Sequence, residues 1–112
     1  NLGRWLRRAI DANVAFDGAA DHHVSEALYL SDPEGNGIEI YADRPRESWQ
    51  WSGDQVQLTT ESLDVRGLIA AGGSAATDAA RVPDTTVIGH IHLRVGGIPQ
   101  AEAFYRDVLG PR

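Results

Sequence analysis

The stretch Leu30-Ser31-Asp32-Pro33-Glu34-Gly35-Asn36-Gly37-Ile38-Glu39-Ile40 decides the local fold of this chain. Its centre, residues 32–37, is dense in residues that preset a turn or tolerate a positive φ. The apolar-rich run 25–31 precedes this turn, and the run 38–42 after it alternates between apolar and polar residues. Two such runs joined by such a turn predict an antiparallel β-hairpin.

The residues before the hairpin predict a helix. Apolar side chains recur there at helical spacing: Leu2, Trp5, Leu6, Ala9 and Ile10. This spacing places them on one face of a helix that Asn13 would stop. We expect 14–16 to begin a short strand and 17–21 to form a loop.

The character of the chain changes after the hairpin. Trp49 and Trp51 bracket a polar stretch, and their expected role is packing rather than the binding of a ligand. Residues 63–71 predict a short helix ended by Gly72-Gly73, and 74–83 are small and polar. Together these features indicate an inter-domain linker over 44–86.

The last segment predicts a strand followed by a helix. Over 87–95, Ile91, Leu93 and Val95 alternate with His90, His92 and Arg94. The first three are expected to face a helix and the other three the opposite side. Pro99 suits the first turn of a helix whose apolar stripe runs to Leu109.

Composition excludes several classes of protein. The 112 residues carry ten basic and sixteen acidic side chains, a formal charge of −6, so nucleic acid and anionic membranes are not expected partners. With no cysteine, disulfide frameworks, zinc ribbons, iron–sulfur clusters and thiol catalysis are excluded. No apolar run reaches the ~18 residues of a membrane span. We expect a cytoplasmic protein without a signal peptide and, because the chain starts at Asn1 and has no Met, a piece of something longer.

These motifs resemble the glyoxalase/bleomycin-resistance/extradiol-dioxygenase superfamily, which has the vicinal oxygen chelate fold. The hairpin resembles the family pattern Asp-Pro-(Asp/Glu)-Gly-Asn-x-(Ile/Val)-Glu, and 89–95 with 103–110 resembles its opening strand and helix. The stretches 21–29 and 43–49 are similar to the catechol 2,3-dioxygenase branch in particular.

The resemblance implies an α+β fold built of βαβββ modules. Residues 1–43 would end a first glyoxalase-like domain with a helix and three strands. Residues 44–86 would be the inter-domain linker, and 87–112 would start a second such domain with a strand and a helix. The chain would thus hold one incomplete module and the beginning of the next.

The resemblance also implies a metal site. In the family, a metal cup takes a His from a first strand, which His90 matches, and a Glu from a last strand, which Glu39 matches. Strand alternation, read independently, places Glu39 and Tyr41 opposite Ile38 and Ile40. We therefore expect a metal at His90 and Glu39, Fe(II) or alternatively Mn(II), because an imidazole and a carboxylate suit either ion.

The remaining polar residues of these strands are candidates for other roles. His92 and Tyr41 are the predicted substrate contacts, and no residue is assigned as catalytic. Chain order would put Glu39 in a first cup and His90 in a second, unless the strand at 87–95 completes the front module. We expect His22 and His23, which fall in a loop, to be structural or solvent-facing.

The leading functional prediction is an extradiol ring-cleaving dioxygenase, which opens a catechol ring with O₂ at an Fe(II) centre. Its partners would be a small aromatic diol and O₂, and the protein is expected to be a homo-oligomer. The 112 residues alone are expected to be inactive. Two alternatives stay open: a metal-free binding protein of the bleomycin-resistance kind, and another metal-dependent glyoxalase-type enzyme.

Overall fold

The structure, a computed structural model, describes residues 1–73 and 83–110 and divides into two compact units, Asn1–Ala80 and Arg81–Arg112. The small polar stretch of the predicted linker, except for Pro83, lies outside the described residues. The same is true of the last two residues of the chain.

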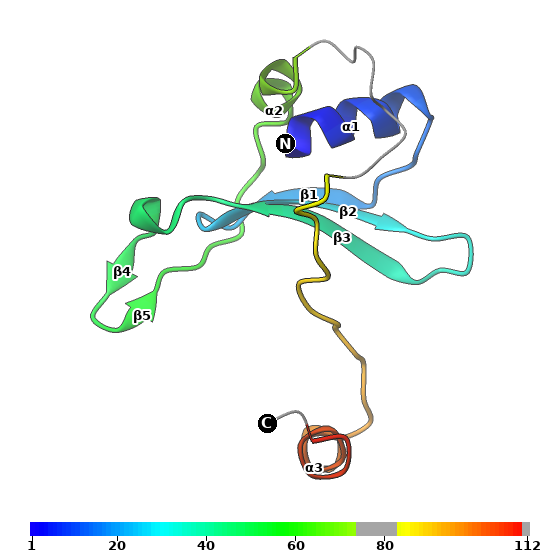
Figure 1. The fold of residues 1–112 in the computed structure, drawn as a ribbon, viewed down its shortest axis with the longest axis vertical. Coiled ribbons are helices and arrows are strands. Elements are labelled where there is room, and N and C mark those ends of the chain that lie inside the picture. Colours follow the sequence, from blue (N-terminus) through cyan, green and yellow to red (C-terminus); the bar gives the residue numbers. More distant parts are fainter. Residues whose placement is uncertain (74–82, 111–112) are drawn as a thin grey trace. The chain divides into compact units, whose positions relative to one another are not determined.

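The first unit combines helices with an antiparallel sheet (Figure 1). Helix α1 (Leu2–Asp11) precedes β1 (Gly18–Asp21), β2 (Ser25–Ser31) and β3 (Gly37–Asp43), which pair in the order β1-β2-β3. The hairpin of β2 and β3 is confirmed, and so is the mixed α+β class. A helix followed by three strands is the order expected at the end of a βαβββ module.

The turn of this hairpin is stabilised by the side chain of Asp32. Its Oδ1 accepts the backbone N–H groups of Glu34 at 2.9 Å and Asn36 at 2.8 Å. These bonds, with one from the Asn36 side chain, lower the pKa of Asp32. Gly35 takes a φ of +85°, which a side chain would resist. The turn thereby fixes the register in which Ser31 pairs with Gly37.

Helix α1 forms over the range that the periodicity predicts. Asn1 caps it by accepting the N–H of Gly3 at 2.9 Å. Leu2, Leu6 and Ala9 are buried, and Asn13 follows the helix at a φ of +56°. The predicted helix and its stop are confirmed.

The expectation for the first strand is wrong. Residues 14–16 form no strand, and β1 occupies most of the stretch expected to be a loop. Pairing explains the difference: β2 is long enough to pair Gly18 with Tyr29 at one end and Asp21 with Glu26 at the other. A neighbouring strand overrides the weak strand preference of Gly, Ala and Asp.

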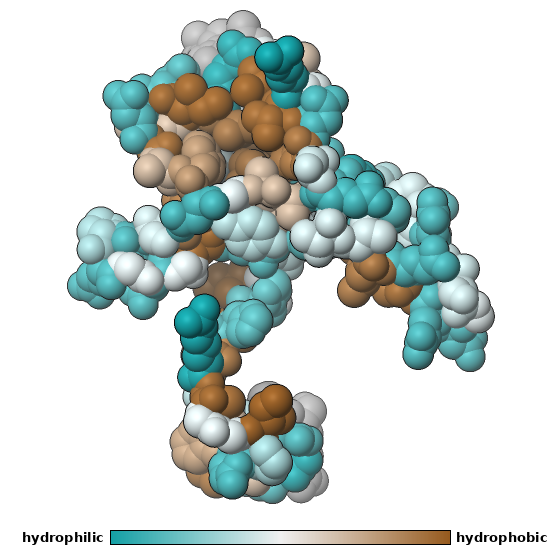
Figure 2. Space-filling view, turned by 180° about the vertical axis from the view of Figure 1, so that it is seen from behind, coloured by the Kyte–Doolittle hydropathy of each residue, from teal (hydrophilic) through white to brown (hydrophobic). Residues whose placement is uncertain are grey.

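The core of the first unit lies between the helices and one face of the sheet. Helices α1 and α2 (Val65–Ala71) cover the same face (Figure 1). Figure 2 shows hydrophobic side chains gathered between these helices and the sheet. The buried members of this cluster are Leu2, Leu6, Leu28, Leu63 and Leu68.

Helix α2 lies within the predicted linker yet packs tightly on α1. A Cβ at Gly3 would meet the carbonyl oxygen of Leu68, and one at Gly72 would meet the backbone of Gly3. The two helices therefore approach each other backbone to backbone. Asp64 caps α2 by accepting the N–H of Gly67 at 2.9 Å, so the helix begins at Val65 rather than Leu63.

Between β3 and α2 the chain makes a projection, residues 45–58, which we call the arm. It contains the 3₁₀ turn η1 (Arg46–Ser48) and a small hairpin of β4 (Trp51–Ser52) and β5 (Gln55–Val56). Figure 1 shows the arm extending away from the three-stranded sheet.

The second unit has a helix but no ladder of strands among residues 83–110. Helix α3 (Ile98–Ala103), with Pro99 in its first turn, continues as a π-helical turn, η2 (Phe104–Val108), so the predicted helix is confirmed. The predicted strand at 87–95 is wrong. An alternating segment forms a ladder only with a neighbour, and in the described part of this unit Ile91 and Leu93 remain exposed.

No helix in the described ranges is long and apolar enough to cross a bilayer.

Candidate functional site: the open face of the first sheet

The face of the sheet opposite the helices carries the polar residues of β2 and β3. Ile40 packs against the helix-side cluster, so its neighbours Glu39 and Tyr41 project from the other face, as predicted. Tyr29 pairs directly with Glu39 in the register of β2 and β3 and lies on the same open face.

A chain of three hydrogen bonds crosses this face. The Tyr29 hydroxyl donates to Oε1 of Glu39 at 3.0 Å, and Nε2 of His22 lies 2.8 Å from the Tyr29 oxygen. Nδ1 of His22 lies 2.8 Å from the carbonyl oxygen of Thr59. A carbonyl only accepts, so Nδ1 carries a hydrogen.

This arrangement changes the acidity of Tyr29. Partial burial raises the pKa of the Tyr29 hydroxyl, and the neighbouring Glu39 carboxylate raises it further. The proton of Tyr29 is therefore held more firmly than that of an ordinary phenol. The side chain acts here as a neutral bridge between an imidazole and a carboxylate.

Asp21, at the end of β1 and next to His22, holds the chain on both sides of the arm. At one end, the guanidinium of Arg44 donates to the two carboxylate oxygens of Asp21 at 2.6 and 2.7 Å and to Glu26 at 3.3 Å. The hydrogen bonds from Arg44 lower the pKa of Asp21 to about 2. At the other end, Asp21 and Glu61 exchange backbone hydrogen bonds of 2.9 Å, and Nε2 of His23 lies 3.3 Å from the Glu61 carboxylate.

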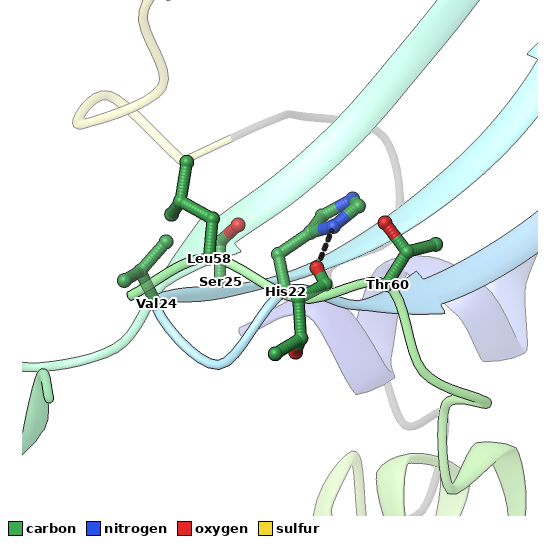
Figure 3. A pocket seen from close by; sticks show the side chains of 6 residues that line it. His22, Val24, Ser25, Leu58 and Thr60 are labelled. Atoms are coloured by element: carbon green, nitrogen blue, oxygen red, sulfur yellow. Dashed lines mark hydrogen bonds between the residues drawn. The ribbon is translucent and has the colours of Figure 1, made fainter. Parts of the chain in front are cut away.

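A hollow of about 460 Å³ lies where the end of the arm passes this loop (Figure 3). Apolar side chains and hydroxyl groups line it together: His22, Val24, Ser25, Leu58, Thr59 and Thr60. Figure 3 shows the His22 ring hydrogen-bonded beside the hollow. Its volume is in the range of small-molecule sites.

The structure brings two of the predicted site residues onto one face. Glu39 and Tyr41 share the open face of the first unit, whereas His90 and His92 belong to the second unit, where both are exposed. The described ranges contain no group of three or more His, Asp or Glu side chains that could hold a metal ion. Imidazole and carboxylate are suitable donors for iron. The described residues nevertheless do not assemble enough of them to make an iron site.

Tyr29 and His22 are the residues of this face that sequence reasoning did not select. The hairpin register contained a signal for Tyr29, because counting back from the pair Ser31 and Gly37 places Tyr29 opposite Glu39. His22 is bound through Thr59, 37 residues away. Its loop position and structural role agree with expectation, but no local pattern could have named its partners.

Comparison with known proteins gives one informative match. The chain is 51% identical over 111 residues to a Bacillus subtilis (strain 168) protein named catechol-2,3-dioxygenase. The match covers 97% of this chain and 38% of that relative, so the chain spans well under half of the relative's length. No family model matches the chain, and no solved structure matches it significantly. The identity supports the extradiol-dioxygenase resemblance.

Proposed function

We propose that the protein containing this chain is an extradiol dioxygenase, which adds both atoms of O₂ to a catechol and opens its ring next to the diol. The observation that carries the proposal is the 51% identity to the catechol-2,3-dioxygenase over nearly the whole chain. The hairpin with Glu39 on an open sheet face agrees with it.

Iron is the proposed cofactor, in the Fe(II) state, with Mn(II) as the alternative. We propose His90 as one of its ligands, with the other donors supplied by parts of the protein outside the described residues. His92 is a proposed substrate contact in the same part of the chain. Glu39 and Tyr41 remain a proposed ligand and a proposed substrate contact on the face of the first unit, where Glu39 already accepts a hydrogen bond from Tyr29.

The test uses the protein at its natural length, loaded anaerobically with Fe(II) and mixed with catechol and O₂. We expect O₂ uptake together with the absorbance of a ring-opened product. His90→Ala should lower both iron content and turnover by more than about 100-fold, because ligand loss exceeds the effect of losing an outer partner. His23→Ala, a change at a half-buried loop residue of the first unit that is not a proposed ligand, should leave both within about twofold.

Failure of the iron-loaded protein to open any simple catechol would overturn the proposal. If the protein instead bound catechol without retaining iron, the metal-free binding protein would be the better account. Turnover of an α-ketoaldehyde adduct rather than catechol would support a glyoxalase-type enzyme.

A further inference from the structure

The turn at 32–37 ends in a chemically reactive pair of residues, Asn36 and Gly37. The amide carbon of an asparagine side chain can be attacked by the backbone nitrogen of the residue that follows it. A glycine in that place hinders the attack least, because it has no side chain. The proposed function uses neither residue, so the fate of this pair is a separate question.

The attacking nitrogen of this pair points away from the neighbouring strand. Gly37 lies opposite Ser31 in the register of β2 and β3. The N–H of Asp32 donates to the carbonyl oxygen of Asn36 at 2.9 Å. This bond makes Ser31 and Gly37, both within the described ranges, a pair of the kind that exchanges no hydrogen bonds across an antiparallel ladder. Pairing with β2 therefore does not restrain the N–H of Gly37.

The residue under attack, Asn36, is held by Asp32. Nδ2 of Asn36 donates to Oδ2 of Asp32 at 2.8 Å, and the backbone N–H of Asn36 donates to Oδ1 at 2.8 Å. Together with the bond from the Asp32 N–H, these contacts fix both the side chain and the backbone of Asn36. The bond from the Asn36 side chain and then that from its backbone lower the pKa of Asp32. At neutral pH the carboxyl group is therefore ionised and only accepts hydrogen bonds.

We propose that Asn36 is a site of spontaneous deamidation and that the carboxylate of Asp32 slows this reaction. The nitrogen of Gly37 forms a bond to Cγ of Asn36 and gives up its proton to water. The Cγ–Nδ2 bond then breaks, and Nδ2 takes up a proton from water and leaves as ammonia. A water molecule opens the resulting succinimide ring to aspartate or isoaspartate. The reaction thus consumes water, releases ammonia and needs neither an oxidant nor a reductant.

The contacts of Asp32 oppose successive steps of this reaction. Nδ2 cannot leave as ammonia without breaking its bond to Oδ2, and an ionised carboxylate has no proton to give it. The attacking nitrogen lies in the same peptide plane as the Asn36 carbonyl, so the bond from the Asp32 N–H resists rotation of that plane toward the side chain. The negative charge of Asp32 also disfavours an anionic intermediate. All these contacts lie within 32–37, so they do not depend on regions of the protein outside this chain.

Deamidation would weaken the hairpin that the turn forms. The new carboxylate would replace an amide that donates to Asp32, and two carboxylates at this distance repel each other. Isoaspartate would also lengthen the backbone at residue 36, directly beside the pair of Ser31 and Gly37 at which the register of β2 and β3 begins. We therefore expect deamidation to loosen the pairing of these strands.

The test follows deamidation of residue 36 in the natural-length protein at neutral pH, by peptide mapping and mass spectrometry. We expect the folded protein to deamidate at least about tenfold more slowly than the same protein unfolded in guanidinium chloride, as a hydrogen bond to a charged group allows. Asp32→Ala should raise the rate in the folded protein by at least about tenfold for the same reason. Asp32→Asn, which keeps one acceptor oxygen, should raise it less. Gly37→Ala, whose added methyl group meets nothing within 4 Å, should lower it by hindering the attack.

Leu28→Ala is the matched control for stability, because it weakens the core of the first unit without changing the turn. Its rate should stay within about twofold of the wild type, since local opening of a turn does not require global unfolding. Equal acceleration by Leu28→Ala and Asp32→Ala would overturn the role of Asp32, as would equal rates in the folded and unfolded protein. A Gly37→Ala variant that deamidates like the wild type would contradict attack by the Gly37 nitrogen. If residue 36 stays intact even in the unfolded protein, it is no deamidation site.

Discussion

The two units of this chain carry the same kinds of sequence pattern with different outcomes. In the first unit, an amphipathic helix and alternating strands pack around a common core that buries Leu2, Leu6 and Leu28. In the second, an alternating segment and an amphipathic helix leave Ile91, Phe104 and Leu109 exposed. A periodic pattern specifies which face would be buried, but burial needs a second surface. The following predictions test this difference, from the largest expected effect to the smallest.

Removing a hydrophobic side chain should give the largest difference in stability between variants of the two units. Leu28 is 2% exposed, so Leu28→Ala should lower the free energy of unfolding by about 3 kcal/mol through lost burial and a cavity. Ile91→Ala, at a position that is 78% exposed, should change it by less than about 0.5 kcal/mol. Urea unfolding of the 112-residue chain, followed by circular dichroism, measures both. Equal losses would mean that Ile91 is packed in solution.

Adding a methyl group where two helices cross should have the next largest effect. Gly3→Ala places a Cβ against the backbone of α2 and should destabilise the chain by about 2 kcal/mol. Gly96→Ala, in the second unit, meets nothing within 4 Å and should be close to neutral. Thermal unfolding compares the two variants. A neutral Gly3→Ala would show that α1 and α2 can separate at little cost.

The ion pair of Arg44 with Asp21, next to the arm, should make the stability of the first unit sensitive to acid. The pKa of Asp21 falls from 3.8 to about 2 on folding, so the folded state favours the ionised carboxylate. This stabilisation is complete above pH 4 and is lost as the pH falls toward 2, a loss of about 1–2 kcal/mol after allowance for partial exposure.

The corresponding variant shows whether Asp21 is the cause. Asp21→Asn should lower stability at pH 7 and flatten its decline between pH 4 and 2. Asp107→Asn, a change at an exposed ion pair of the second unit, should preserve the wild-type pH profile. A profile for Asp21→Asn as steep as that of the wild type would assign the acid sensitivity to other carboxyl groups.

Breaking the hydrogen-bond chain on the open face should have the smallest effect on stability. Tyr29→Phe removes the hydroxyl that joins His22 to Glu39 and should cost about 1 kcal/mol. Tyr105→Phe, at an exposed tyrosine of the second unit, should cost less than about 0.5 kcal/mol. Amide hydrogen exchange at Glu61 gives a second measure, because Tyr29→Phe should loosen the loop that Glu61 pairs with. Unchanged exchange at Glu61 would show that the hydrogen bonds of Tyr29 do not contribute to the pairing of Glu61 with Asp21.

Local sequence signals predict those parts of the fold that local interactions form. The turn at 32–37 provides its own hydrogen bonds through Asp32, and α1 provides its own cap at Asn1, so both were predictable. The strand β1 was not, because its residues have little strand preference and pair only through β2. The strand expected at 87–95 fails for the opposite reason: its pattern is strong, but the described residues give it no neighbour.

In the candidate site, too, the residues placed by local patterns were predictable and those placed by long-range contacts were not. Alternation in β3 was enough to place Glu39 and Tyr41 on the open face, since a strand fixes the direction of every second side chain. The contacts of His22 with Tyr29 and Thr59 depend on the return of the arm to the loop at Asp21. Sequence periodicity does not predict a contact between such distant residues, so only the structure reveals the hydrogen-bond chain.

The most direct test of the proposed function follows the oxygen atoms. The natural-length protein, loaded with Fe(II), is given catechol under ¹⁸O₂, and the product is analysed by mass spectrometry. The proposal predicts a ring-opened product that carries both labelled atoms. Unchanged catechol, or a ring-opened product with no labelled atom in its carboxylate, would contradict it.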